Sequence, residues 1–172
     1  MKADNNAEWL PIVDEQGNVK AKATRGECHN GKTNLLHPVV HLHVFNMQGE
    51  VLLQHRPTWK TIQPNKWDTA VGGHVDYGET IEQALRREVG EEIGITDFKA
   101  YFLCSYVHQS DVERELVYVY TTRTDKLPEC SDEVDDLRFF SDEELNARMG
   151  TSFFTPNFEE EWKMLHQRHL LQ

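Results

Sequence analysis

The order of hydrophobic and polar positions along the chain predicts a protein built mainly of strands. In several stretches, apolar and β-branched side chains alternate with polar ones, a period of two that is typical of half-buried strands. The predicted strands span residues 9–13, 19–24, 39–45, 51–55, 67–71, 98–108, 115–122 and 137–140. The first two flank the turn Glu15-Gln16-Gly17-Asn18, so residues 8–25 should form an N-terminal hairpin.

Three other segments carry the signals of helices. Residues 80–93 open with Thr80 and Gln83, which match a capping-box pattern, and they end before Gly94, which suits a helix C-terminus. The other two expected helices are a short one opened by Ser141 and Glu144 and an end helix over residues 159–171.

The succession of many strands and few helices indicates a mixed α/β or α+β fold, in which helices pack on a sheet. No internal repeat, low-complexity tract or linker divides the sequence. We therefore expect a single domain over residues 1–172, with residues 1–7 loosely held because they are polar and terminal.

The helix over residues 80–93 would direct negative charge toward the core. At about 100° per residue, its apolar stripe consists of Ile81, Ala84, Leu85 and Val89. On the same wheel, Glu88 and Glu92 fall within this stripe and Glu91 borders it. Arg86 and Arg87 fall on the outward side, where they offset little of the repulsion.

Two interpretations of these carboxylates remain open. A run of charge is most often a solvated face. Alternatively, a hard divalent cation such as Mg²⁺ or Mn²⁺, which prefers oxygen ligands, would make the cluster favourable. The Gly72-Gly73 pair just upstream favours the cation, because glycines let the backbone approach an ion or a phosphate closely.

Composition limits the classes of partner. The 172 residues are 38% hydrophobic and 27% charged, which fits a globular domain, and their net charge of -11 disfavours nucleic-acid polymers and anionic membranes. An anionic substrate would then need a metal cation as mediator. The widely spaced Cys28, Cys104 and Cys130 indicate no disulfide framework. With neither a signal peptide nor a membrane segment in view, we expect a cytoplasmic protein.

The segment from Gly73 to Ile95 resembles the Nudix box, which reads G, five residues, E, seven residues, R-E-U-x-E-E-x-G-U with U bulky and apolar. All specified positions agree. The resemblance implies the Nudix fold, an α/β/α sandwich around a mixed sheet with a loop-helix-loop. It also implies hydrolysis of a diphosphate joined to another group, with Mg²⁺ or Mn²⁺ as cofactor. Carried over by position, the metal ligands are Glu88, Glu91, Glu92 and the Gly73 carbonyl, Glu79 and Arg87 organise the loop, and Glu91 is our choice of general base.

A narrower resemblance links the chain to isopentenyl-diphosphate isomerases and the hydrolases related to them. It rests on Val13-Asp14, Gly26-Glu27-Cys28-His29, Leu36-His37, Phe45-Asn46, Gly49-Glu50 and Trp67. In that family His and Glu residues hold a second metal, and the matching positions here are His37, His74, Glu113 and Glu115. His29 is near a matching position, but its interval to His37 is one residue off. Arg56 and Lys60 resemble the cations that hold the diphosphate, and we expect Gly72 and His74 beside it.

This chain departs from the isomerases in two ways. Their catalytic cysteine position is occupied by Gly72, and their version of the box lacks carboxylates that this chain keeps. Both departures favour a hydrolase that cleaves a small nucleotide-like or other organic diphosphate, acting as a monomer or homodimer. An isomerase and a non-catalytic nucleotide-binding module are the two alternatives.

Several other conspicuous residues have ordinary interpretations. His41 and His43 share one strand face, where packing is favoured over metal ligation. His166 and His169 are expected to be solvated on the end helix. The alternatives for two pairs stay open: Trp59 and Trp67 either stack on a base or plug the sheet edge, and Glu113 and Glu115 form either a site or a solvent-facing pair.

Overall fold

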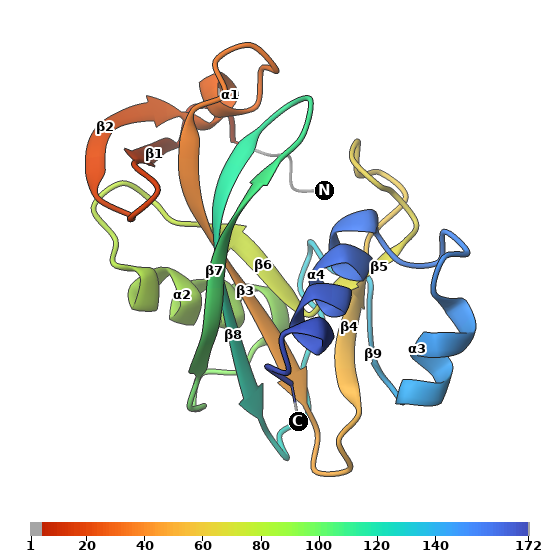
Figure 1. Ribbon diagram of the computed structural model, residues 1–172. Helices are drawn as coiled ribbons and strands as arrows, with labels where there is room; N and C mark the ends of the chain where they lie inside the picture. Colours follow the sequence, from red (N-terminus) through yellow and green to blue (C-terminus); the bar gives the residue numbers. More distant parts are fainter. Residues whose placement is uncertain (1–4, 172) are drawn as a thin grey trace.

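The computed structural model describes residues 5–171, within which a mixed seven-stranded sheet forms the centre of the molecule (Figure 1). The strands are β1 (Trp9–Val13), β2 (Val19–Thr24), β3 (Leu36–Phe45), β4 (Val51–His55), β5 (Trp67–Thr69), β6 (Val71–His74), β7 (Tyr101–Gln109), β8 (Arg114–Arg123) and β9 (Asp136–Phe140). The helices are α1 (Arg25–Cys28), α2 (Ile81–Ile93), α3 (Asp142–Arg148) and α4 (Pro156–Gln167).

Strand β3 organises the sheet. The strand order is β5-β4-β3-β8-β7, with β6 also paired to β3 and β9 paired to β4. The β3–β8 pair is parallel and the other pairs are antiparallel, so the sheet is mixed. Because side chains alternate along a strand, Val40, Leu42 and Val44 pack toward α2, whereas His41 and His43 reach Glu161 on α4.

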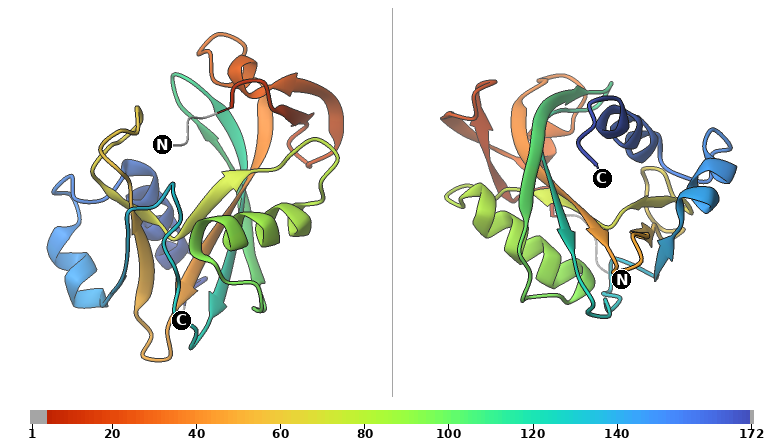
Figure 2. Two further views of the ribbon diagram at one scale, coloured as in Figure 1. Left: turned by 180° about the vertical axis from the view of Figure 1, so that it is seen from behind. Right: turned by 60° about the horizontal axis from the view of Figure 1, so that its bottom comes forward.

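Helices cover both faces of this sheet, which confirms the expected α/β/α layers. Figure 2 shows α2 on one face and α4 on the other. The α2 layer closes over a core that includes Leu42, Val71, Leu85 and Ile93, and the α4 layer closes over a second core that includes Phe158. The cleft that contains the candidate site is lined by residues of α2, of the sheet and of the start of α4.

Helix α2 forms where the sequence predicts it. The Thr80 side chain accepts a hydrogen bond from the backbone N–H of Gln83, and the Gln83 side chain accepts one from the backbone N–H of Thr80. At the other end, Gly94 terminates the helix in the left-handed region at φ 70°. Such a cap satisfies backbone donors that the first turn leaves unpaired. The helix that carries the carboxylates is therefore fixed at both ends.

The N-terminal hairpin rests on the loop that precedes α2. Strands β1 and β2 pair antiparallel, as predicted. The backbone N–H of Tyr77 donates to the carbonyl of Trp9 at 2.9 Å, and Lys22 lies over both of these rings. Asn6 accepts a backbone hydrogen bond from Gly26. Residues 1–7 were expected to be loosely held, and residues 1–4 of this segment lie outside the described residues.

Two element predictions were wrong and one element was missed. The strand expected over residues 67–71 is divided into β5 and β6, and β6 includes both glycines, which pair with β3. The end helix covers Pro156–Gln167 instead of 159–171, because Thr155 caps it and Pro156 suits its first turn. The short helix α1, capped by Thr24 and Glu27, was not predicted.

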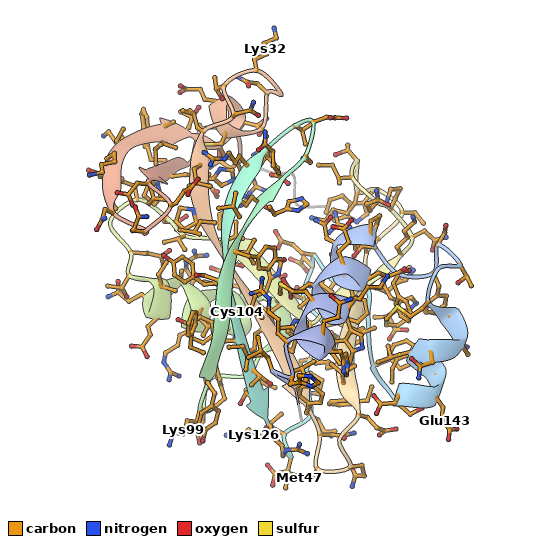
Figure 3. All side chains as sticks on the ribbon, viewed as in Figure 1. Lys32, Met47, Lys99, Cys104, Lys126 and Glu143 are labelled. Atoms are coloured by element: carbon orange, nitrogen blue, oxygen red, sulfur yellow. The ribbon has the colours of Figure 1, made fainter. Side chains whose placement is uncertain are left out.

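The cysteines and the surface agree with the compositional expectations. Cys28, Cys104 and Cys130 are free, and Figure 3 labels Cys104 on β7. His166 and His169 are exposed, as predicted. No helix within residues 5–171 is long and apolar enough to cross a membrane.

Candidate active site

A cleft of about 830 Å³ runs across the end of the sheet between the hairpin, α2 and the start of α4. It is lined by residues from distant parts of the chain, among them Asn6, His41, Arg56, Glu88 and Thr155. Every predicted site residue except His37 and Glu79 lines this cleft. Glu79 binds Arg87, which lines the cleft, and His37 faces Glu115, which lines it as well.

The carboxylates of α2 form one wall of the cleft. Glu92 is 6% exposed, and the side chain of Glu88 is 13% exposed. Gln54 donates to Oε1 of Glu92 at 3.2 Å, while Oε2 of Glu92 is buried with no hydrogen-bond partner in the described part of the chain. Burial raises the pKa of Glu88 to about 7, although Arg87 acts against it. Burial and the Glu88 charge raise the pKa of Glu92 well above its usual range.

Gly73 makes room for this pair. A Cβ atom built on Gly73 would lie 2.2 Å from the carboxylate carbon of Glu88, which no real side chain could tolerate without a shift. The strand β6 therefore approaches α2 so closely that its backbone and the Glu88 carboxylate share one small space. This is the arrangement expected if a carbonyl and a carboxylate bind one ion.

Arg87 corrects one prediction from the helical wheel. The wheel placed it on the outward side of α2, yet the side chain curls back under the loop and is half-buried. It donates two hydrogen bonds to Glu79 at 2.8 Å, one to Glu88 at 2.9 Å and one to the carbonyl of His74 at 3.1 Å. A long flexible side chain can cross from its helix face in this way, which a wheel of Cα directions does not represent.

Glu91 differs from its two neighbours on α2. Its side chain is 51% exposed and lines the cleft, and Arg87 reaches its Oε2 at 3.4 Å. The sequence placed Glu91 at the border of the interior stripe, and this intermediate position is what the structure has.

Five further side chains form a second cluster, and all of them except His37 line the cleft. One ligand-type atom from each of His29, His37, His74, Glu113 and Glu115 lies within 4.8 Å of all the others. His29, the C-cap residue of α1, belongs to this cluster despite its unusual interval to His37. Glu113 and Glu115 are thus no solvent-facing pair.

The local contacts of the cluster leave imidazole nitrogen atoms available to a ligand. Nδ1 of His37 lies 2.9 Å from the carbonyl of Leu35, so that carbonyl can hold its proton and leave Nε2 facing the cluster. Nε2 of His37 and Nε2 of His74 are buried without a hydrogen-bond partner among residues 5–171, and each lies 3.9 Å from Oε2 of Glu115. Burial lowers the pKa of both imidazoles, and burial next to Glu113 raises the pKa of Glu115 to about 7.

Both clusters fit divalent cations by the chemistry of their donors. Unpartnered buried atoms are rare in native proteins and call for a ligand or an ion. The α2 wall offers carboxylate and carbonyl oxygens, the set that Mg²⁺ and Mn²⁺ prefer, and the second cluster adds imidazole nitrogens. A cation at either place would satisfy the atoms left open there.

The expected diphosphate-binding residues lie on the rim. Arg56 donates to the carbonyls of Ile62 and Gln63, and Lys60 lies over the ring of Trp59. Trp59 lines the cleft, whereas Trp67 packs against Phe140 and stacks with Phe153, so of the two only Trp59 faces a ligand.

One part of the cleft was not found by sequence reasoning. His41 and His43 both bind Glu161 on α4, at 2.7 and 2.6 Å. Packing of the two histidines was predicted, but Glu161 was read only as one residue of an amphipathic helix. Its position among apolar neighbours, Phe158, Trp162 and Leu165, was the available signal.

Residues 35–160 match the NUDIX domain family. The chain belongs to the Nudix family. An uncharacterised Nudix hydrolase of Listeria innocua is 36% identical over 158 residues, which cover 88% of this chain and 89% of that protein. This confirms the resemblance of the box and the class of enzyme, a hydrolase of the pyrophosphate-linkage type.

The narrower resemblance is confirmed as well. An isopentenyl-diphosphate Delta-isomerase of Agromyces mediolanus is 31% identical over 148 residues, covering 82% of this chain and 71% of the isomerase. A crystal structure of a Deinococcus radiodurans protein superposes with a TM-score of 0.76 at 26% identity, over 91% of this chain and 98% of that one. This Nudix hydrolase therefore stands near hydrolases and isomerases alike.

Proposed function

We propose that this Nudix hydrolase cleaves the diphosphate linkage of a small organic diphosphate with the help of Mg²⁺ or Mn²⁺. The observation that carries the proposal is the pair of Glu88, largely buried, and Glu92, whose buried Oε2 has no hydrogen-bond partner among the described residues. Two carboxylates in such a place would be destabilising unless protonated or bound to a cation. Glu88, Glu92, Glu91 and the carbonyl of Gly73 would hold the cation.

The remaining residues have roles that follow from their contacts. When bound, the cation supplies charge neutralisation on the diphosphate and a lowered pKa for the attacking water. Arg87 holds Glu88 and Glu79 in place, which keeps the loop before α2 closed on the cleft. Glu91, accessible in the cleft, would accept the proton of the water at its Oε1, since Arg87 already contacts Oε2.

The substrate side of the cleft is proposed from its cations. Lys60 and Arg56 lie on the same rim and would contact phosphate oxygens, with Gly72 and His74 at the floor. The second cluster, His29, His37, His74, Glu113 and Glu115, would hold another divalent cation. The ring of Trp59 is the surface in the cleft on which a base or another planar group could stack.

An isomerase is the second candidate, because the Agromyces relative carries that name. The residue arrangement argues against it: within residues 5–171 none of the three cysteines lines the cleft, and Gly72 offers no proton-transfer group. The proposal for this chain is therefore hydrolysis.

A substrate panel tests the proposal. Purified protein with Mg²⁺ or Mn²⁺ would be incubated with nucleoside diphosphates, sugar nucleotides, dinucleotides, coenzyme A and prenyl diphosphates, and released phosphate or monophosphate would be measured. We expect at least one to be hydrolysed. Allylic product from isopentenyl diphosphate would instead support the isomerase, and no turnover of any compound would favour a binding module.

A matched pair of variants then tests the carboxylates. Glu92→Gln should lower kcat by at least about 100-fold, since loss of a metal ligand removes several kcal/mol of transition-state stabilisation. Glu82→Gln, an exposed carboxylate in the first turn of the same helix, should leave kcat unchanged. Equal kcat for both variants would remove Glu92 from its assigned role.

A further inference from the structure

A buried carboxylate on α4 gathers three hydrogen-bond donors from the sheet. Oε1 of Glu161 lies 2.7 Å from Nδ1 of His41 and 2.6 Å from the hydroxyl of Tyr106, and Oε2 lies 2.6 Å from Nε2 of His43. Glu161 is 2% exposed. A carboxylate that is so buried and receives three donors at short distance is ionised and rigidly oriented.

The two histidines on this carboxylate differ in what lies behind them. His43 is 1% exposed and packs against Phe158 and Trp162, so it belongs to the core. The side chain of His41 is 20% exposed and lines the cleft. With Nδ1 on Glu161, its Nε2 has no hydrogen-bond partner among residues 5–171 and is not buried.

Gly72 keeps this nitrogen accessible. Gly72 pairs with His41 across β6 and β3, and a Cβ atom at position 72 would lie 3.3 Å from Cδ2 and 3.6 Å from Nε2 of the ring. Any larger side chain would extend over the imidazole edge. The glycine therefore opens a small recess in the cleft floor with Nε2 of His41 in its wall.

The charge of the ring suits an anionic group. Although burial acts to lower it, the Glu161 carboxylate raises the pKa of His41 to about 9. The imidazolium then offers Nε2–H as a donor in a cleft otherwise lined by many carboxylates. Two of the cations in the cleft are already held, Arg87 by Glu79 and Glu88, and Arg56 by two loop carbonyls.

We propose that His41 forms a phosphoryl-binding subsite, in which Nε2–H donates a hydrogen bond to a phosphate oxygen of the substrate above Gly72. Glu161 is the positioning residue, because it fixes the ring through Nδ1 and never meets the ligand itself. The subsite lines the same cleft as the α2 carboxylates and the histidine-rich cluster, in which the diphosphate is proposed to lie. The inference rests on the proposed function in assuming that the cleft takes a diphosphate.

His41→Asn is the sharpest variant for this proposal. The Asn amide can still donate to Glu161 in place of Nδ1, but no donor remains at the recess. We expect KM to rise about 10- to 100-fold, the usual effect of losing a hydrogen bond to a charged group, with kcat changed far less. His166→Gln, at an exposed histidine of α4, is the control and should leave both constants unchanged. An unchanged KM in a folded His41→Asn protein would overturn the subsite.

Glu161 is tested through its dependence on His41. Glu161→Gln keeps the volume and removes the charge, so it should raise KM by a similar factor. The double variant should show no further rise, because Glu161 acts only through the ring. Additive effects would show that Glu161 contributes in another way and would contradict its positioning role, provided thermal unfolding shows each variant to be folded.

A binding measurement separates this proposal from the proposed function. Methylenediphosphonate, which cannot be hydrolysed at its bridge, would be titrated with Mg²⁺ into protein carrying ¹⁵N-labelled histidine. We expect the Nε2 resonance of His41 to shift and the affinity to fall about 10- to 100-fold in His41→Asn. Binding through His41 without turnover of any diphosphate would uphold the subsite and reject the hydrolase. Turnover of a diphosphate, with neither a shift of the His41 resonance nor a change in affinity in His41→Asn, would uphold the hydrolase and reject the subsite. No binding of methylenediphosphonate by the wild type would also reject the subsite.

Discussion

At the scale of single residues, Gly73 has the clearest steric requirement in the site. Its missing side chain leaves the space that the Glu88 carboxylate occupies. Gly90, on α2 a turn beyond Arg87, has no such requirement, since an added Cβ would meet only Thr96 at 4.0 Å. Gly73, which the motif specifies, and Gly90, which stands at an unspecified position within it, thus differ in kind, and substitution can separate them.

Gly73→Ala should abolish turnover while the protein stays folded. The new methyl group would displace the Glu88 carboxylate, whose flexible side chain can move away, so we expect kcat to fall at least about 100-fold with little change in unfolding temperature in EDTA. Gly90→Ala is the control and should keep full activity and gain up to about 1 kcal/mol of helix stability. Normal turnover by Gly73→Ala would show that Glu88 need not occupy its observed position.

The His41–Glu161 contact predicts a pH dependence of stability. The pKa of His41 is raised to about 9, above its ordinary value of 6.5, so the contact stabilises the fold fully below pH 6.5 and loses this contribution as pH rises through about 9. The free energy of unfolding of the wild type should therefore exceed that of His41→Asn most near pH 6, and the difference should narrow by pH 10. Urea unfolding of both proteins at several pH values measures it, and a constant difference would contradict the assignment of charge.

Residue roles could be predicted where they depend on local spacing. The positions of Glu88 and Glu92 follow from the helical period, and the structure has both directed inward. Glu161 could not be assigned, because its partners His41 and His43 lie 120 and 118 positions away along the chain. Arg87 was misplaced for a different reason, since the reach of its side chain exceeds the width of a helix face.

At the scale of elements, α2 depends on its cap. The capping box of Thr80 and Gln83 fixes the first turn, and the carboxylates follow two turns later on the same rigid cylinder. Loss of this cap would let the first turn fray without touching the cleft directly.

Thr80→Ala should lower the free energy of unfolding by about 1 kcal/mol, the usual cost of removing an N-cap side chain. Thr80→Ser keeps the hydroxyl that accepts from the Gln83 backbone, so it should cost far less. Chemical denaturation of the three proteins gives the comparison. Equal losses for Ala and Ser would mean that the methyl group, and not the hydrogen bond, supports the helix.

The wrong element predictions have different causes: pairing with tertiary partners overrides local preference in one case, and local capping residues decide the other. Gly72 and Gly73 suit a bend, but pairing with His41 and Val40 draws them into a strand. For α4, the signals were local and present, since Thr155 precedes Pro156 at the true start. Apolar periodicity alone does not reveal this start, because it depends on the capping residues.

At the scale of the whole molecule, the two clusters lead us to expect that divalent cations contribute to the stability of the fold. Each cluster brings together residues from separate elements, the second one from α1, β3, β6 and β8 and the residues beside them. Ions that bind such sites favour the folded chain, because the unfolded chain cannot present the ligands together.

We therefore expect millimolar Mg²⁺ or Mn²⁺ to raise the unfolding temperature by several degrees. A ligand at 100 times its Kd stabilises the native state by about 2.7 kcal/mol. Glu92→Gln should show a smaller rise, since only the histidine-rich cluster remains intact. Differential scanning calorimetry in EDTA, in K⁺ of equal ionic strength and in each divalent cation measures the effect. An unfolding temperature that ignores divalent cations would contradict preformed sites.

The N-terminal hairpin has a consequence for how this protein can be cut and recombined. The family match begins at residue 35, yet Asn6, Glu8, Arg25 and His29 upstream of it line the cleft. A minimal domain that begins at residue 35 would keep helix α2 and lose one wall of the cleft. Evolution can likewise replace that wall and change which molecule is cleaved, while the carboxylates of α2 stay the same.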